Sequence, residues 1–186
     1  MFIMSLTKLA QTLIKEKFDR INYAVDATCG NGHDTLFLAN LCKKEGMVYS
    51  FDVQEEALDN AEKLINDYAH PASVMFVNTG HENMEKVIKP KVNVVMFNLG
   101  FLPNSDSNIC TKPETTIPAL ESALNILREG GMLTVLCYPG TEEGRVETDE
   151  VVKWLKNLDK NEVKISKHLS EKPDETTPVL YVVGKR

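Results

Sequence analysis

The chain alternates between short apolar runs and longer stretches in which apolar residues recur every three or four positions. Short runs rich in β-branched residues predict buried strands, whereas the longer spacing predicts amphipathic helices. Seven strands are expected, over 23–28, 46–53, 73–77, 91–100, 132–140, 161–169 and 177–186. Helices are expected over 6–18, 34–44, 54–68, 114–131 and 150–158, and a polar loop over 101–116.

Strands that alternate with helices predict an α/β fold with a Rossmann-like, doubly wound and mostly parallel sheet of seven strands. The last two expected strands are joined by a short segment, "SEKPDE", that contains no helix. A parallel pair needs a long crossover, so these strands should be antiparallel neighbours at the end of the sheet. Because the chain contains no repeat and no linker, residues 1–186 are expected to form a single domain.

The composition is typical of a globular protein, with 42% hydrophobic and 26% charged residues. The net charge of −6 does not by itself indicate a nucleic-acid binder, although a local basic patch can lie on an acidic protein. The four cysteines show no C-x-x-C spacing, which predicts reduced thiols and no zinc framework. The first 18 residues are too polar for a signal peptide or a membrane span, so a cytoplasmic protein is expected.

The first expected strand runs into "DATCGNGHDT", residues 26–35, which contains two glycines where the next helix begins. Ligands of open α/β sheets bind at the carboxyl ends of the strands. Gly30 and Gly32 permit a tight turn and leave room for a ligand beside the backbone. Asp52 ends the second strand, where a carboxylate can accept hydrogen bonds from both hydroxyls of a ribose. The pattern therefore predicts a nucleoside cofactor.

Two residues of this loop distinguish between cofactors. A dinucleotide fingerprint would have a third glycine at position 35, where this chain has Thr35, so an NAD-dependent oxidoreductase is disfavoured. Asp26 agrees with this, because a carboxylate suits an ammonium group and repels a pyrophosphate. S-adenosylmethionine has an ammonium group, a ribose and an adenine but no phosphate. A metal or thiol site of Cys29, His33 and Asp34 is an alternative, although its spacing differs from that usual in zinc sites.

The fourth expected strand ends in "FNLGFLP", residues 97–103, at the same edge of the sheet as the glycine loop. Asn98 and the carbonyl of Leu99 can accept hydrogen bonds from an amine, and Phe101 can stack on a flat base. Asn98 and Gly100 can also simply form a turn. The position of this segment beside the glycine loop and Asp52 favours a site for the acceptor of a transferred group.

Together, D-x-x-x-G-x-G, the acid that ends the second strand, N-x-x-[aromatic] and the antiparallel end of the sheet resemble a class I S-adenosylmethionine-dependent methyltransferase. The segment "NLGF" is similar to the N-P-P-[YF] motif of amino-methyltransferases. More narrowly, "DATCGNGHDT", "FDVQ", "GHEN", "FNLGFLP" and "YPG" resemble a small bacterial family labelled putative rRNA methylases. Its members methylate the aminomethyl group of wobble 5-aminomethyl-(2-thio)uridine in tRNA, which gives 5-methylaminomethyl-(2-thio)uridine.

The resemblance implies a role for each matching residue. It implies that the acceptor amine is oriented by Asn98, Leu99 and Phe101. It implies that S-adenosylmethionine is bound by Asp26, Thr28, Gly30, Asn31, Gly32, Asp34, Thr35, Asp52, Gln54, Gly80, His81, Glu82 and Asn98. It implies that the substrate is contacted by Phe101, Pro103, Asp106, Lys112 and Tyr138. Three positions depart from the family pattern, namely Phe101, the pair Asn104–Ser105, and Thr141, and the last two of these touch the expected substrate side.

The implied partner is tRNA, bound through its anticodon stem-loop, with no metal and no membrane, and a homodimer is compatible with the sequence. The basic groups that could meet this RNA are Lys8, Lys15, Lys17 and Arg20, then Lys112, and finally Lys153, Lys156 and Lys160. The first and last groups are also explained as solvated helix faces. Two other functions remain open, a methyltransferase for rRNA or a small amine and a non-catalytic nucleotide- or RNA-binding module.

Overall fold

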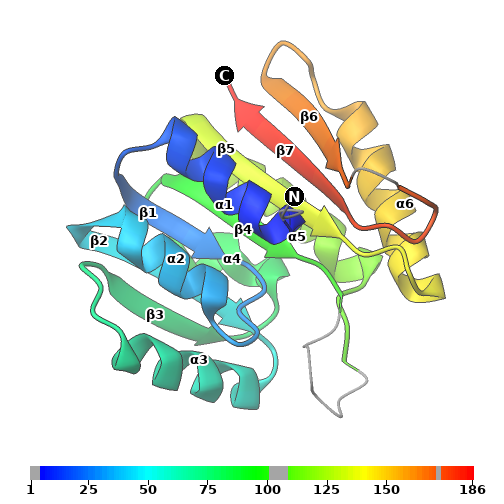
Figure 1. Cartoon of the computed structure of the whole chain (residues 1–186). Coiled ribbons are helices and arrows are strands. Elements are labelled where there is room, and N and C mark those ends of the chain that lie inside the picture. Colours follow the sequence, from blue (N-terminus) through cyan, green and yellow to red (C-terminus); the bar gives the residue numbers. More distant parts are fainter. Residues whose placement is uncertain (1–4, 101–108, 171–172) are drawn as a thin grey trace.

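The computed structural model describes residues 5–100, 109–170 and 173–186, and these residues form an α/β sandwich around one twisted sheet (Figure 1). Within them, seven strands lie in the order β3-β2-β1-β4-β5-β7-β6. The strands are β1 (Ile21–Asp26), β2 (Cys42–Asp52), β3 (Ser73–Asn78), β4 (Val92–Asn98), β5 (Leu127–Cys137), β6 (Val163–Leu169) and β7 (Val179–Lys185). The helices are α1 (Leu6–Lys17), α2 (His33–Leu41), α3 (Glu55–Asp67), η1 (His81–Asn83), α4 (Met84–Val87), α5 (Pro113–Ile126) and α6 (Glu142–Asn157).

The sheet has the predicted mixed topology. Strands β1 to β5 pair in parallel, and β7 lies antiparallel between β5 and β6. Register shifts occur where β1 meets β2 and where β4 meets β5, at the amino-terminal edge of the sheet. The order reverses between β1 and β4, so the carboxyl ends of these two strands flank the position at which ligands of doubly wound sheets bind.

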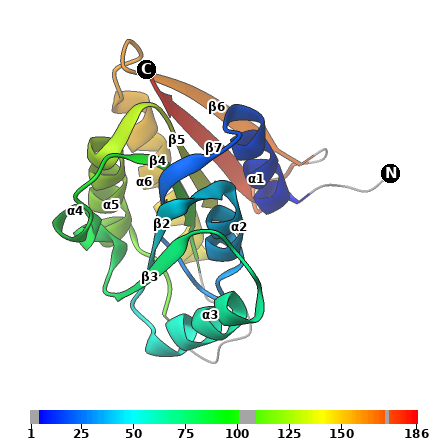
Figure 2. The ribbon, with the colours of Figure 1, turned by 90° about the vertical axis from the view of Figure 1, so that its left-hand side faces the viewer.

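Helices cover both faces of the sheet, with α1, α2 and α3 on one side and α4, α5 and α6 on the other (Figure 2). Each face has its own apolar core. Ile14 of α1 and Leu38 of α2 are fully buried against the first face, and Leu120 of α5 and Val151 of α6 against the second. Because both faces are covered, the central strands are apolar along most of their length, as β4 is from Val94 to Phe97.

Several element boundaries differ from the sequence prediction. Helix α2 ends at Leu41, three residues early, because Cys42 is extended and pairs with Ile21. The guanidinium of Arg20 donates hydrogen bonds to the carbonyls of Asn40 and Cys42, which satisfies carbonyl groups at this helix end. The expected loop over 101–116 is too long at its end, since α5 begins at Pro113.

Helix α6 begins eight residues earlier than predicted, at Glu142. The side chain of Thr141 accepts a hydrogen bond from the backbone N–H of Gly144, which caps the helix. Two acidic residues in the first turn also stabilise the helix, because they interact favourably with the positive end of its dipole. Both signals are present in the sequence but lie before the apolar spacing that predicted the helix.

All four cysteines lie in the described residues, where none of them is paired in a disulfide. Among the described residues, no helix combines the length and the apolar character needed to cross a membrane.

Candidate functional site

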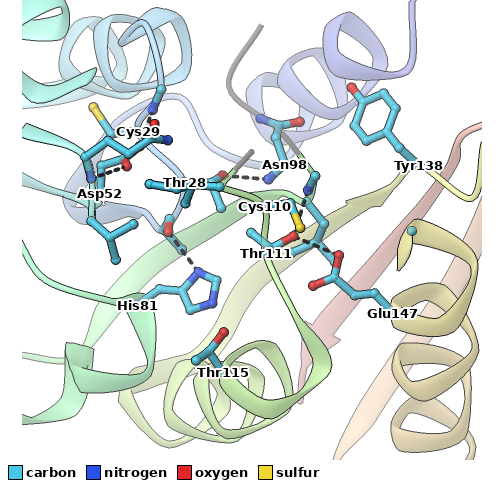
Figure 3. A pocket seen from close by; sticks show the side chains of 18 of the residues that line it. Thr28, Cys29, Asp52, His81, Asn98, Cys110, Thr111, Thr115, Tyr138 and Glu147 are labelled. Carbon is cyan, nitrogen blue, oxygen red and sulfur yellow. Dashed lines mark hydrogen bonds between the residues drawn. The ribbon is translucent and has the colours of Figure 1, made fainter. Parts of the chain in front are cut away.

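A cavity of about 660 Å³ opens at the carboxyl ends of β1, β2, β4 and β5 (Figure 3). Its lining falls into two groups that meet at residues 98–100. The glycine-loop half is lined by residues 27–31, 33, 34, 52–54 and 79–82. The α6 half is lined by residues 109–111, 115, 138, 140, 141, 143, 144, 147 and 176, and Thr7 of α1 also borders the cavity. The volume is in the range of sites that enclose a small-molecule ligand.

The glycine loop is closed onto the end of β2 through Asp52. The backbone N–H of Gly30 donates to Asp52 Oδ2, and that of Gln54 donates to Oδ1, both at 2.9 Å. Gly30 has a φ of 50°, in the left-handed region that favours glycine. Gly30 and Asp52 therefore lie side by side on the wall of the cavity, as the sequence pattern predicted, and Thr28, Asn31 and Gln54 line it with them.

Gly32 has a different role from the one that the sequence suggested. It has a φ of 80° and does not line the cavity. A Cβ at this position would lie 2.7 Å from the Cβ of Ala61, so the missing side chain lets α3 approach the start of α2. The prediction that Gly32 clears space for a ligand is thus corrected, because helix α3 occupies that space.

Asp26 and Thr35 lie behind the cavity wall. Asp26 is 0% exposed, and its carboxylate accepts hydrogen bonds from Thr35 Oγ1 (2.7 Å) and from the backbone N–H of Thr28 (3.2 Å). Thr35 Oγ1 also lies 2.6 Å from Ser50 Oγ. Burial raises the pKa of Asp26 to about 7, with a further rise from the charge of Asp34. Asp26 and Thr35, which were expected to bind the donor, thus fix the glycine loop from inside and do not line the cavity.

The loop after β3 completes this half of the cavity with Gly80, His81 and Glu82. The imidazole Nδ1 of His81 lies 3.1 Å from the carbonyl of Ala27, which can only accept, so the ring carries its proton on Nδ1. Burial lowers the pKa of His81, which favours the neutral ring. The buried Oε2 of Glu82 has no hydrogen-bond partner among the described residues, whereas its Oε1 accepts a hydrogen bond from Asn83 Nδ2.

Asn98 lies where the two halves meet (Figure 3). Its backbone N–H donates to Thr28 Oγ1 at 2.7 Å, and its side-chain Nδ2 donates to Asp34 Oδ2. Gly100 has a φ of 119°, in the left-handed region that favours glycine. Leu99 lines the cavity between them and is held to the sheet by a hydrogen bond from its N–H to the carbonyl of Leu136. The structure therefore joins the glycine loop and the "NLG" turn, as predicted.

A cluster of hydrogen bonds around the buried Glu147 in the α6 half was not predicted from the sequence. Glu147 of α6 is 3% exposed and accepts bonds from Thr116 Oγ1 (2.6 Å) and Thr111 Oγ1 (2.7 Å). Thr111 Oγ1 in turn accepts the backbone N–H of Gly100 at 2.7 Å. Glu147 thereby connects α6 to Thr116 of α5 and, through Thr111, to Gly100. No local motif marks Glu147, because its partners lie more than 30 residues away in the sequence.

The remaining predicted substrate residues are distributed unevenly. Tyr138 is 41% exposed and lines the α6 half. Lys112 is exposed at the start of α5 and does not line the cavity. Phe101, Pro103 and Asp106 lie outside the described residues.

The alternative of a metal or thiol site finds no support in the contacts of its residues. Cys29 is buried with its Sγ 3.8 Å from Thr35 Oγ1, and burial raises the pKa of its thiol to about 12. Asp34 is bonded to two amides. Within residues 5–100, 109–170 and 173–186, no cluster of three or more histidine, cysteine or acidic side chains could hold a metal ion.

The sheet order with its antiparallel β7, and a cavity walled by a glycine loop and an acid after β2, define the class I S-adenosylmethionine-dependent methyltransferase fold. Residues 48–184 match the model of the family described as "Putative rRNA methylase", and the chain belongs to that family.

Solved structures agree with this assignment. The chain is 37% identical to a "putative rRNA-methylase" from Clostridium thermocellum, with a TM-score of 0.94 and full coverage of both chains. It is 31% identical to a "putative methyltransferase" from Streptococcus mutans that was solved in complex with SAH, with a TM-score of 0.88 and full coverage of both chains.

A curated relative of Arabidopsis thaliana is named "tRNA (mnm(5)s(2)U34)-methyltransferase, chloroplastic". The identity is 31% over an alignment of 155 residues, and the match covers 78% of this chain. The chain spans 57% of the length of that protein.

Proposed function

We propose that this protein transfers a methyl group from S-adenosylmethionine to the primary amine of wobble 5-aminomethyl-(2-thio)uridine in tRNA. The observation that carries the proposal is the placement of Asn98. Its side chain lies where the two halves of the cavity meet, and Asp34 accepts its amide hydrogen. This leaves Oδ1 as the acceptor that the side chain can offer to an amine. The name of the plant relative and the motif "NLGF" support the same acceptor.

The glycine-loop half fits the methyl donor. Asp52 retains lone pairs for the ribose hydroxyls after accepting two backbone N–H groups. The buried Glu82 Oε2, which has no partner among the described residues, suits an N–H or O–H donor of the ligand. Gly30, Asn31, Thr28 and Gln54 would line the rest of the donor, with Gly80 and His81 beside the adenine.

Asp34 remains a proposed donor contact through the lone pairs that its two amide partners leave. Asp34 lines the cavity, whereas Asp26 does not. The carboxylate expected beside the ammonium group of the donor is therefore assigned to Asp34.

S-adenosylmethionine would supply the methyl group from its sulfonium sulfur. Asn98 Oδ1 and the carbonyl of Leu99 would accept the two amine hydrogens, which aims the nitrogen lone pair at the methyl carbon. The N–C bond forms while the C–S bond breaks, its electron pair stays on sulfur, and the product amine releases a proton. Because Asn98 is held by partly buried hydrogen bonds to Thr28 and Asp34, positioning would be the main contribution of the protein.

The RNA is expected to reach the cavity over basic surface. Lys112 immediately precedes α5 and follows the lining residues Cys110 and Thr111. A second, open groove between α1 and α2 is lined by three cationic side chains, Lys8, Lys15 and Arg20, with Asp19 as its acidic residue, and it shares His33 with the main cavity. Such a groove favours an extended polyanion, rather than a free small amine, as the substrate. Phe101, Pro103 and Asp106 stay proposed substrate contacts, as does Tyr138.

The description of the family favours rRNA as a second candidate for the acceptor. A single experiment separates the two. The purified protein and S-adenosylmethionine are incubated with an anticodon stem-loop that carries 5-aminomethyluridine, with the same stem-loop carrying plain uridine, and with unmodified rRNA. A gain of one methyl mass on the first RNA alone is expected. Methylation of rRNA, or of the plain stem-loop, would contradict the proposal.

A further inference from the structure

Helix α1 is connected to the reacting end of the cavity through a chain of hydrogen bonds. Gln11 of α1 donates from Nε2 to Asp34 Oδ1 at 2.7 Å, and Asn98 donates from Nδ2 to the other oxygen, Oδ2. Asp34 is 5% exposed, so this bonding takes place largely away from water. The same helix also borders the cavity directly, because Thr7 of α1 lines it together with Tyr138.

The chemistry of the central group fixes the direction of both amides. An ionised carboxylate can only accept hydrogen bonds, so Gln11 and Asn98 must each turn their NH₂ group toward Asp34. The amide of Asn98 is planar, and its Oδ1 must then point away from Asp34. Without an ionised Asp34, the NH₂ and oxygen of Asn98 could exchange places, since the two ends have nearly the same shape.

We propose that Gln11 is a positioning residue, which acts through Asp34 to keep Oδ1 of Asn98 turned toward the acceptor amine. This inference rests on the proposed function for its choice of acceptor. Helix α1 precedes residues 48–184, which match the family model, so the match assigns no role to Gln11. The helix is therefore part of the transfer site in addition to covering one face of the sheet.

The charge on Asp34 is the property that Gln11 protects. Burial raises the pKa of Asp34, while the hydrogen bonds from Gln11 and Asn98 lower it, and the adjacent His33 lowers it as well. The other titratable groups that face it are Asp26 on β1 and Tyr138 after β5. Loss of Gln11 removes one of the stabilising bonds, so Asp34 would take up a proton at a higher pH and release its hold on Asn98.

The test compares Gln11→Ala with Ile14→Val, a control that loosens the packing of α1 without touching the chain of hydrogen bonds. Ile14 is fully buried one turn further along the same helix. With the aminomethyl stem-loop as acceptor and saturating donor, Gln11→Ala should lower kcat by about 5- to 20-fold and leave KM for the RNA within about twofold. Ile14→Val should leave kcat within about twofold, at comparable thermal stability.

Two further readouts separate positioning from general loosening of α1. The acid limb of the kcat profile should move to higher pH in Gln11→Ala, because only ionised Asp34 orients Asn98, whereas Ile14→Val should leave the limb in place. In an Asp34→Asn background, Gln11→Ala should change kcat by less than about twofold, since the two residues act in series. Equal losses in Gln11→Ala and Ile14→Val, or an unchanged acid limb, would overturn the inference.

A measurement without RNA keeps this inference separate from the choice of acceptor. In the protein bound to S-adenosylhomocysteine, the side-chain NH₂ protons of Asn98 should exchange slowly with solvent and show separate, shifted NMR signals. Gln11→Ala should speed this exchange at least severalfold, and Ile14→Val should not. If the stem-loop proves not to be the acceptor, unchanged exchange in Gln11→Ala would still refute the role of Gln11, and faster exchange would support it.

Discussion

The two halves of the cavity are held in different ways. In the glycine-loop half, the loop bonds to the strand beside it, as in the bond from the Gly30 N–H to Asp52. In the α6 half, the turn at Gly100 depends on Thr111, which depends on Glu147 from a helix far along the chain. The glycine-loop half is thus held by a contact between neighbouring strand ends, which the fold brings together. The α6 half is held by side chains from elements that lie far apart in the sequence. We infer that the first half determines the methyl donor and the second the acceptor.

A change at the junction of the halves should have the largest effect. Asn98→Ala removes the acceptor that orients the amine, and we expect kcat to fall about 100-fold or more. The dissociation constant for S-adenosylhomocysteine, measured by calorimetry, should stay within about threefold. An equal loss of turnover and of donor affinity would contradict the division, because Asn98 would then belong to the donor site alone.

A change in the glycine-loop half should act on the donor. Asp52→Asn replaces one carboxylate oxygen that accepts a backbone N–H with an NH₂ group that cannot, and it weakens the contact with the ribose. We expect donor affinity to fall about 10- to 100-fold, from the loss of one or two hydrogen bonds to a charged group. The exposed Asp59→Asn on α3 is the matched control. If kcat at saturating donor fell as steeply as donor affinity, the role of Asp52 would extend to the acceptor.

A change in the α6 half should act on the acceptor. Glu147→Gln keeps the size of the side chain but replaces one carboxylate oxygen with an NH₂ group. That group cannot accept the hydrogen bond that a threonine hydroxyl donates to Glu147. We expect the free energy of unfolding to fall by about 1–3 kcal/mol and kcat to fall about tenfold, with donor affinity unchanged. Glu143 lies one turn earlier on α6, borders the same cavity and is exposed. Glu143→Gln is therefore the matched control and should change neither stability nor donor affinity.

The last expected effect concerns the pH dependence of stability and leaves the two halves of the cavity unchanged. The pKa of Asp26 is raised from 3.8 to about 7 by burial, so the folded state holds a proton that the unfolded state releases. Its contribution therefore becomes less favourable as pH rises from about 4 to about 7 and is constant above that range. Relative to the wild type, Asp26→Asn should gain about 1–4 kcal/mol in unfolding free energy across this window.

Urea titrations at pH 4.5, 6 and 8 would measure this difference. A difference in unfolding free energy that stays the same at all three pH values would contradict the prediction. It would mean that the Asp26 carboxylate contacts water or a fixed positive charge.

The same contrast explains what could be predicted from the sequence. The order of strands and helices, the antiparallel end of the sheet and the pairing of Gly30 with Asp52 follow from local patterns and from the rule that parallel strands end at one edge. The role of Gly32 could not be predicted, because it depends on how closely Ala61 of α3 approaches. The burial of Asp26 depends on Ser50 and Thr35 in the same way.

The α6 half was largely invisible to sequence patterns. Glu147 occupies an ordinary position in an acidic helix, and its importance arises only because α5 and α6 bring Thr116 and Thr111 to it. Gln11 likewise resembles any polar residue on an amphipathic helix. Contacts of this kind depend on tertiary packing, which local spacing does not encode.

We propose that one half of this cavity binds the methyl donor while the other presents a wobble aminomethyl group to it. Mass spectrometry of tRNA nucleosides tests it directly, in cells that lack the protein and in the same cells supplied with wild type or Asn98→Ala. We predict loss of 5-methylaminomethyl-(2-thio)uridine with accumulation of 5-aminomethyl-(2-thio)uridine, reversed by the wild type but not by Asn98→Ala. Unchanged levels of the methylated nucleoside in cells without the protein would contradict the account.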